Sequence, residues 1–330
     1  MSVKVAVSLL SVLCVAAVGL AGAPANYQVV HGWPTVPDDF AFGQVTGVAV
    51  DSRNRVFVLH RANVPWNDEL NTGAPIQLPT IMVFDGQSGK PITSWGAKVF
   101  RNPHGFSIDS QDNVWVTDCG RQQVLKFSND GTLLLALGEE QKAGLDGRHF
   151  NQPTDVAVAP DGSIYVSDGY INSRVVKFSA KGEFLLEWGK HGTQPGEFDV
   201  PHGITVDREG QVYVADRLNV RIQVFTGDGK FLRQWQSKEM GRPWAIRIGP
   251  DGALYMIDGG DLVGGAFNPQ PPDRGYVIKM DLQGKILNKW SRYGNYDGQL
   301  FWGHAVAIGK DGAVYVGDIQ GRRAQKFVPR

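Results

Sequence analysis

Short runs of alternating apolar and polar residues, separated by polar turns, recur along the whole chain. The clearest copy runs from Asn102 to Asp118 and reads as one strand, a polar turn and a second strand that ends on Asp. Alternation with a period of two is typical of strands with one buried face. Six copies are visible, and their first strands open near Val45, Pro103, Pro153, Pro201, Pro243 and Gly303.

Each repeat predicts four strands. Two further segments follow the first pair, and they are clearest as Val175–Phe178 and Phe184–Trp188. Turns such as Asp228-Gly229 favour antiparallel connections between them. Four-stranded sheets repeated every ~40–50 residues are typical of a β-propeller. The last repeat lacks its fourth strand, which Tyr27–Val30 can supply, so we predict an all-β, six-bladed propeller closed by an N-terminal strand.

Two series of equivalent residues predict structural roles. We expect the large aromatic residue of each second strand to pack between blades: Phe57, Trp115, Tyr165, Tyr213, Tyr255 and Tyr315. We expect the Asp that ends the second strand to cap the following turn, at 118, 168, 216, 258 and 318. Two insertions rich in Gly, Pro and Asn, Asn63–Pro79 and Gly259–Gly275, are expected beside the functional face, or else as solvated loops.

Composition narrows the class of protein. The chain has 330 residues with 33 basic and 33 acidic side chains, so nothing favours a nucleic-acid partner. Residues 1–25 resemble a signal peptide cleaved after Ala25, with an uncleaved anchor as the alternative. We therefore expect one domain over 26–330, secreted or periplasmic, free of the membrane and monomeric. Its single remaining cysteine, Cys119, cannot form an internal disulfide.

One slot differs between neighbouring repeats in an informative way. The residue at the start of each first strand is, in order, Thr46, His104, Thr154, His202, Trp244 and His304. Alternate blades of a six-bladed ring are about 120° apart, so three His at one height should converge on the axis. Three imidazoles with an open fourth position suit a catalytic Zn²⁺, and Fe²⁺, Mn²⁺ or Co²⁺ could also fit. The alternative is three polar residues lining a wet channel.

Strand direction adds further candidates beside these His. The second strand of each blade returns to the face where the first begins, so the residues that follow it should lie near the metal. Arg61, Tyr170 and Arg217 stand out there, and Cys119 points the same way. Arg can bind a carboxylate through two hydrogen bonds, and Tyr near a cation can have a lowered pKa and act as a base. Surface ion pairs are the alternative.

These residues resemble a known family. The segments Gln44–Asp51 with Leu59–Arg61, Pro103–Asp109, Gln152–Val158 with Val166–Arg174, and Val200–His202 with Val214–Arg217 are similar to NHL-repeat propellers. Within these, they resemble the peptidyl-α-hydroxyglycine α-amidating lyases, over nearly the whole chain after residue 25.

The resemblance implies zinc on His104, His202 and His304, and active-site roles for Arg61, Tyr170 and Arg217. It implies cleavage of a peptidyl-α-hydroxyglycine to a peptide amide and glyoxylate. Zinc would polarise the hydroxyl, Tyr170 would take its proton, and the two arginines would hold the carboxylate and the developing charge.

The resemblance also implies calcium, and there the chain departs from the family pattern. Backbone carbonyls of Val48 and Phe106 would bind that ion together with an Asp, whose place Ala305 takes here. Calcium favours such carboxylate oxygens. Trp302 replaces a Met near the metal.

We therefore expect a zinc-dependent carbon–nitrogen lyase of the peptidylamidoglycolate type, acting on a peptide or small molecule. Two alternatives remain at this point. One is another exported metal-dependent enzyme, such as a hydrolase of the gluconolactonase type, and the other is a non-catalytic scaffold.

Overall fold

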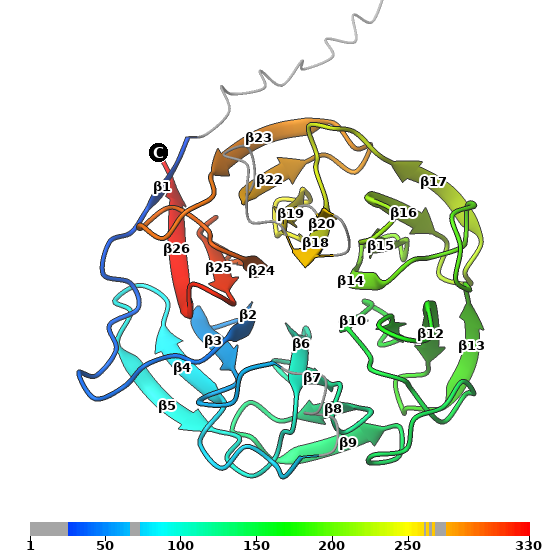
Figure 1. Ribbon diagram of the computed structural model, residues 1–330, viewed down its shortest axis with the longest axis horizontal. Helices are drawn as coiled ribbons and strands as arrows, with labels where there is room; N and C mark the ends of the chain where they lie inside the picture. The colour runs from blue at the N-terminus through cyan, green and yellow to red at the C-terminus, as the bar shows by residue number, and fades with distance from the viewer. Residues whose placement is uncertain (1–25, 67–72, 261, 264–265, 268–274) are drawn as a thin grey trace, which may run out of the picture.

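The alternating segments form six four-stranded antiparallel sheets, arranged as blades around a central axis (Figure 1). The structure is a computed structural model, and it describes residues 26–66, 73–260, 262–263, 266–267 and 275–330. The predicted all-β propeller is confirmed, and no helix occurs within those ranges.

The first two strands of each blade lie nearest the axis. The innermost strands are β2 (Val45–Val50), β6 (Pro103–Ile108), β10 (Asp155–Val158), β14 (Pro201–Val206), β18 (Pro243–Ile248) and β24 (Gly303–Ile308). The second strands are β3 (Arg55–His60), β7 (Val114–Asp118), β11 (Ile164–Asp168), β15 (Val212–Asp216), β19 (Leu254–Asp258) and β25 (Val314–Asp318).

The outer two strands complete each blade. The third strands are β4 (Ile81–Asp85), β8 (Gln123–Phe127), β12 (Arg174–Phe178), β16 (Arg221–Phe225), β22 (Tyr276–Met280) and β26 (Arg323–Pro329). The outermost strands are β5 (Pro91–Trp95), β9 (Leu133–Leu137), β13 (Phe184–Trp188), β17 (Phe231–Trp235), β23 (Ile286–Ser291) and β1 (Tyr27–Val29). A small additional pair, β20 (Leu262–Val263) and β21 (Ala266–Phe267), lies between β19 and β22 in the sequence.

The two ends of the described chain close the ring. Strand β1 pairs antiparallel with β26, with Gln28 opposite Val328, so the N-terminal segment supplies the outer strand of the last blade. Figure 1 shows the blue strand β1 beside the red strand β26. This pairing covers the outer edge of β26, and it was predicted from the missing fourth strand.

The six aromatic residues of the second strands are buried between neighbouring blades. Trp115 of β7, for example, packs with Val156 and Ile164 of the next blade. All six are at most 2% exposed. The predicted packing role is therefore confirmed, and these contacts place successive inner strands at a fixed spacing around the axis.

The Asp series caps the blades on one face, as predicted. The carboxylate of Asp118 accepts the backbone N–H of Asn102 and of Gly120, both at 2.9 Å. In the first blade His60 takes this place, because its Nδ1 accepts the N–H of Gly43 at 3.3 Å and of Ala62 at 3.1 Å. Each cap ties the segment before the first strand to the turn after the second.

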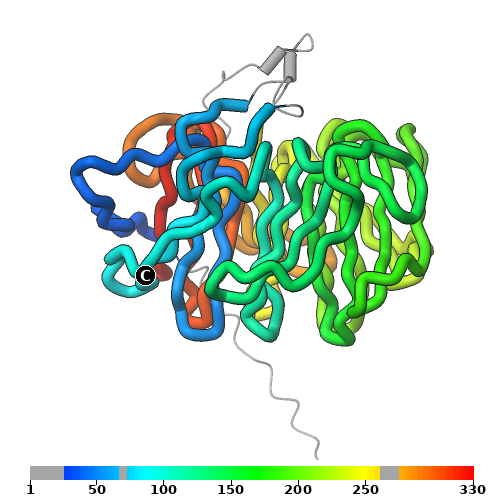
Figure 2. Tube along the Cα trace, turned by 90° about the horizontal axis from the view of Figure 1, so that it is seen from below, coloured from blue at the N-terminus to red at the C-terminus, as the bar shows by residue number. Residues whose placement is uncertain are grey.

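The described parts of the first insertion lie on the capped face. Figure 2 shows the light-blue flanks of the first insertion rising above one face of the ring. Most of the second insertion, Gly259–Gly275, lies outside the described residues, as does the predicted signal peptide at 1–25. Among the residues that are described, there is no apolar helix of membrane-spanning length.

Candidate metal centre and active site

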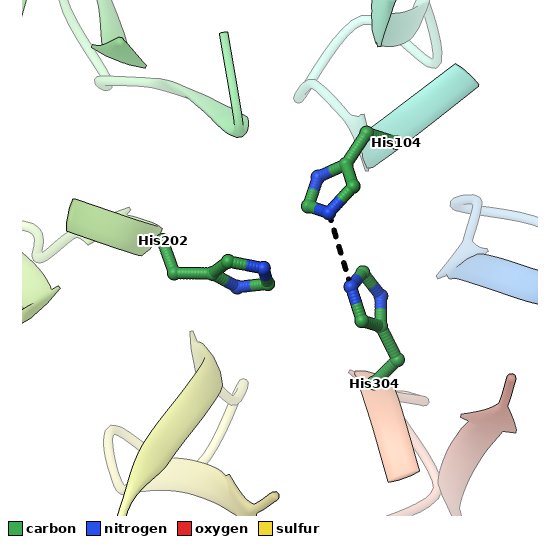
Figure 3. Close-up of side chains that lie close together, drawn as sticks. All are labelled: His104, His202 and His304. Carbon is green, nitrogen blue, oxygen red and sulfur yellow. Dashed lines mark hydrogen bonds between the residues drawn. The ribbon is translucent and has the colours of Figure 1, made fainter. Parts of the chain in front are cut away.

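Three histidines from alternate blades meet on the axis. His104, His202 and His304 are the second residues of β6, β14 and β24, and one ring nitrogen of each lies within 4.8 Å of the others. Figure 3 shows the three rings converging on one point. All three are at most 4% exposed. The convergence expected from the alternate slots is therefore present.

The backbone sets the tautomer of each ring. Nδ1 of His104 lies 2.6 Å from the carbonyl oxygen of Thr154, and Nδ1 of His202 lies 2.8 Å from that of Trp244. Nδ1 of His304 lies 2.8 Å from the carbonyl oxygen of Thr46. A carbonyl only accepts, so Nδ1 carries the proton in every ring and Nε2 keeps its lone pair.

Burial keeps the three rings neutral. It lowers the pKa of His104 and of His202 well below the ordinary value, and it lowers the pKa of His304 to about 3. The hydrogen bonds to the carbonyls oppose this effect and do not outweigh it. Neutral imidazoles with free Nε2 atoms are the form in which His binds a metal.

The three histidines are arranged to bind a metal ion rather than to hydrogen-bond to one another. Nε2 of His104 lies 3.1 Å from Nε2 of His304, and neither nitrogen has a proton to share. Two lone pairs at this distance repel unless a cation lies between them. Tetrahedral zinc with bonds of ~2 Å separates its nitrogen ligands by roughly 3.4 Å, so small shifts would bring the three rings around one ion.

A cavity of about 300 Å³ opens above the histidines. Arg61 lies in its wall, directly after β3, and its side chain is 1% exposed. Nη1 donates to Oε1 of Gln44 at 3.1 Å, whereas Nε and Nη2 have no hydrogen-bond partner among the described residues. Burial lowers the pKa of Arg61 to about 10. Arg61 is therefore cationic at neutral pH, with two donors available to a ligand.

Tyr170 and Arg217 complete the polar part of this wall. The Tyr170 hydroxyl lies 2.9 Å from Nε2 of His104 and 3.4 Å from Nε2 of His202. The Arg217 guanidinium lies 5.4 Å from the centre of the Tyr170 ring and 4.7 Å from that of Trp244. The structure thus brings all three polar residues predicted from the sequence to the His centre.

The pKa of Tyr170 differs from the sequence-based expectation. Burial raises the pKa of its hydroxyl, and the charges of Arg217 and Arg61 offset only part of that rise. The expectation of a lowered pKa considered a nearby cation but not the removal of the phenol from water.

Cys119 directly follows β7, and its surroundings make the thiol unreactive. The thiol is fully buried, and its Sγ is 3.4 Å from the carbonyl oxygen of Pro153. Burial and the nearby Asp118 raise its pKa well above the ordinary value. A thiol in that state is a poor nucleophile.

Sequence reasoning missed several residues of the cavity wall. Gln44 accepts from Arg61 and also from the backbone N–H of Trp66 at 2.7 Å, so it anchors the first insertion to the site. Trp66 packs against Tyr170 with ring centres 5.3 Å apart. A usable signal was the slot before each first strand, which reads Gln44, Asn102, Gln152, Val200, Arg242 and Trp302. Three of these six line the cavity: Gln44, Arg242 and Trp302.

The calcium implied by the resemblance does not fit the channel below the histidines. The carbonyl oxygen of Phe106 already accepts a hydrogen bond from Nη2 of Arg247 at 2.9 Å. Ala305 offers no ligand atom beyond its backbone, and the guanidinium of Arg247 is itself cationic. Val48 is buried on β2, where it pairs with Val58, and its carbonyl alone does not make a site.

Comparison with known proteins agrees with this architecture. The family model described as NHL repeat matches residues 100–127, 150–178 and 198–225. Peptidyl-glycine alpha-amidating monooxygenase A of Xenopus laevis is 38% identical over 316 residues, which are 90% of this chain and 33% of that protein. The chain therefore spans about a third of the length of this relative.

A second relative matches over most of its own length. Peptidyl-alpha-hydroxyglycine alpha-amidating lyase 2 of Drosophila melanogaster is 32% identical over 328 residues, which are 91% of this chain and 75% of that protein. A gluconolactonase structure from Xanthomonas campestris aligns with a TM-score of 0.59 at 16% identity, covering 93% of this chain and 97% of that one. At that identity the likeness concerns the fold alone.

The repeats, the six blades and the axial histidines define an NHL-repeat β-propeller with a candidate metal centre in its channel. Within that class, the chain belongs to the family of peptidyl-α-hydroxyglycine α-amidating lyases.

Proposed function

We propose that this protein is a zinc-dependent lyase that cleaves a peptidyl-α-hydroxyglycine, or a related N-acyl compound, to an amide and glyoxylate. One observation carries the proposal. His104 and His304 line the same cavity as Arg61, Tyr170 and Arg217, and the Tyr170 hydroxyl also lies 3.4 Å from Nε2 of His202. His104, His202 and His304 would hold the zinc, which supplies a Lewis acid able to polarise an oxygen of the substrate.

The two arginines bind and orient the substrate. Its carboxylate needs donors inside a cavity with little water, and Arg61 offers Nε and Nη2 there. The Arg217 guanidinium lies 5.4 Å from the centre of the Tyr170 ring and adds a second positive charge. Charged donors held in advance at the place where charge develops are the most effective form of electrostatic stabilisation.

Tyr170 moves the proton. Breaking the carbon–nitrogen bond requires one proton to leave the substrate hydroxyl and one to reach the amide nitrogen. The raised pKa keeps the phenol protonated, so Oη can give its proton to the nitrogen and take up the proton of the hydroxyl. The hydroxyl group of Tyr170 is unchanged after one turnover, and no further reactant is needed.

The remaining wall favours an apolar acyl group. Trp66, Trp244 and Trp302 line the same cavity, and the rings of Trp244 and Trp302 are 5.2 Å apart. Aromatic walls bind apolar groups through large buried areas. We infer that the residue or acyl group before the hydroxyglycine is apolar and bulky.

The direct test is glyoxylate release from a synthetic N-acyl-α-hydroxyglycine, with the purified, zinc-loaded protein. His104→Ala serves as the metal-site control, and lactones and esters are offered in parallel. We expect release that depends on zinc and is lost in the control. If the folded, zinc-bound protein released no glyoxylate but hydrolysed a lactone, the hydrolase alternative would replace this proposal. If it turned over neither substrate, it would be a binding scaffold.

We also propose that the protein is exported and that residues 1–25 are removed. N-terminal sequencing of the protein from its native host should begin at Asn26. A chain that retains its first residues and stays with membranes would contradict this.

A further inference from the structure

The channel below the histidines contains one charged pair. Two slots of the inner strands, one and three residues after the histidine slot, carry small or neutral residues in nearly every blade. The first slot reads Gly47, Gly105, Asp155, Gly203, Ala245 and Ala305. The second reads Ala49, Ser107, Ala157, Thr205, Arg247 and Ala307. Asp155 and Arg247 are the only charged residues in these two layers, and they point to the same place.

Arg247 reaches from its own blade across the channel to the opposite blade. Its Nη2 donates to the carbonyl oxygen of Phe106 on β6, at 2.9 Å. Its Nη1 donates to the carbonyl oxygens of Ile204 on β14 at 3.2 Å and of Ile246 on β18 at 2.8 Å. Phe106, Ile204 and Ile246 occupy the same slot of three blades. One guanidinium therefore binds backbone carbonyl oxygens from three blades.

Asp155 balances this charge and is itself fully engaged. Its Oδ2 lies 2.7 Å from Nη1 of Arg247, and its Oδ1 lies 2.9 Å from Nη2. Oδ2 also accepts the backbone N–H of Ile204 at 3.0 Å. The Asp155 side chain is 7% exposed, so the ion pair is largely removed from water. A paired carboxylate of this kind holds a guanidinium in one orientation.

Carbonyl oxygens and one carboxylate around an axis are also what a calcium ion would bind. Here the guanidinium occupies that position. The space left between Arg247 and the histidines is about 20 Å³, little more than one water molecule. A dication placed there would meet a buried positive charge, and the carboxylate that could compensate is already paired.

We propose that the guanidinium of Arg247 is the fixed structural cation of this channel and takes the place of a calcium ion. It ties the inner strands of the second, third, fourth and fifth blades to one another through Phe106, Asp155, Ile204 and Ile246. The protein then binds a single metal ion, at the three histidines, and its stability does not depend on calcium. This inference does not rest on the proposed lyase activity.

The first test uses the unmodified protein. Zinc-loaded protein is dialysed against radioactive calcium at millimolar concentration, and thermal unfolding is followed with calcium and with a calcium chelator that spares zinc. We expect no calcium above background and the same Tm in both buffers. One calcium ion retained per chain, with a higher Tm in calcium, would overturn the proposal.

The second test removes the Arg247 guanidinium and asks whether calcium can replace it. Arg247→Ala should lower Tm by several degrees more than Arg233→Ala, a matched arginine that also donates to a backbone carbonyl but lies outside the channel. Arg247→Ala combined with Ala305→Asp should then gain calcium binding and recover Tm when calcium is added, whereas Ala305→Asp alone should not.

Each outcome decides the question. An unchanged Tm in Arg247→Ala, or a folded double variant that binds no calcium, would mean that the guanidinium is not the structural cation. If the alanine variants fail to fold, Arg247→Lys provides the comparison. Lysine keeps the positive charge but cannot form the paired hydrogen bonds of the guanidinium. The variant should therefore fold with a lowered Tm and still exclude calcium.

Discussion

At the residue scale, the identity of single side chains within near-identical repeats decides the chemistry. Tyr170 follows β11, which ends on Asp like its counterparts in four other blades, yet the Tyr170 hydroxyl reaches two of the axial histidines at 2.9 and 3.4 Å. The repeat fixes the position of the turn after each second strand, and the side chain found at that turn fixes its chemistry.

Replacing Tyr170 by Phe should remove the proton carrier and leave the metal centre intact. General acid–base groups contribute about 10²–10⁴-fold to rate, so we expect kcat to fall by roughly that factor. Zinc content, measured by elemental analysis, should not change. Tyr296→Phe, at an 80% exposed position, is the control. A Tyr170→Phe enzyme of nearly normal kcat would exclude the hydroxyl from the reaction.

Trp302 should set the preference for the acyl group. Trp302→Ala enlarges the cavity beside Trp244 and removes part of its aromatic wall. Discrimination by apolar contacts is worth about 10–200-fold, so the ratio of kcat/KM for an aromatic over an acetyl substrate should fall by about tenfold. The ratio is measured with N-benzoyl- and N-acetyl-α-hydroxyglycine. An unaltered ratio would place the acyl group elsewhere.

His60 should make stability depend on pH. Burial lowers its pKa from 6.5 to about 4, so the folded state favours the neutral ring that accepts two backbone N–H groups. Stability from this group is complete above pH 6.5 and is lost progressively as the pH falls towards 4, because the unfolded chain binds the proton first. The total loss is about 3 kcal/mol.

Urea unfolding at pH 7 and pH 4.5 measures this effect. His60→Gln keeps an acceptor and cannot titrate in this range, so it should lose less stability than the unmodified protein over the same interval. An identical loss in both proteins would assign the acid sensitivity to other groups.

At the scale of elements, the ring depends on a short strand far from the last blade in sequence. Strand β1 has three residues and contacts β26 through a ladder that includes Val30 N to the carbonyl of Lys326 at 2.8 Å. Pairing of this kind removes an open sheet edge, and it completes the blade that carries His304 on β24.

Gln28→Pro should therefore weaken closure. Gln28 lies opposite Val328 in the ladder, and proline both removes an N–H and strains the extended chain. Losing one hydrogen bond of a partly exposed ladder costs roughly 0.5–1.5 kcal/mol, and Tm should fall accordingly. Gln28→Ala keeps the N–H and is the control. Equal Tm values for the two variants would show that the ladder contributes little.

At the scale of the whole molecule, the candidate metal centre combines side chains from three blades that are not neighbours in the ring. His104, His202 and His304 come from the second, fourth and sixth blades, and each ring is held by a carbonyl of the blade that follows. All six blades therefore take part in one centre, which makes the centre and the closed ring mutually dependent.

Removing the metal should destabilise the entire ring. A ligand present at about 1,000 times its Kd stabilises the folded state by ~4 kcal/mol, so a chelator should lower Tm, and added zinc should restore it. His104→Ala should abolish this zinc effect, whereas His191→Ala, with a side chain 76% exposed, should leave it unchanged. A Tm that ignores both chelator and zinc would exclude a metal centre of this kind.

The repeat pattern by itself determined the six blades, the closing strand, the histidine trio and the polar residues around it. These conclusions follow from periodicity, because equivalent slots in a closed ring must lie at equivalent places. The proposed roles of Tyr170, Arg61 and Arg217 came from the resemblance to a known family. All three line one cavity, as the strand directions had predicted.

Only the tertiary structure decided what depends on distances across the axis. Nδ1 of each histidine meets a backbone carbonyl, and Arg247 reaches Phe106 on the opposite blade. Burial raises the pKa of Tyr170. All three facts depend on residues that are far apart in sequence. Charge burial and hydrogen-bond geometry are properties of that three-dimensional arrangement. A pattern along the chain shows which slots differ, but it does not show which of the differing side chains touch.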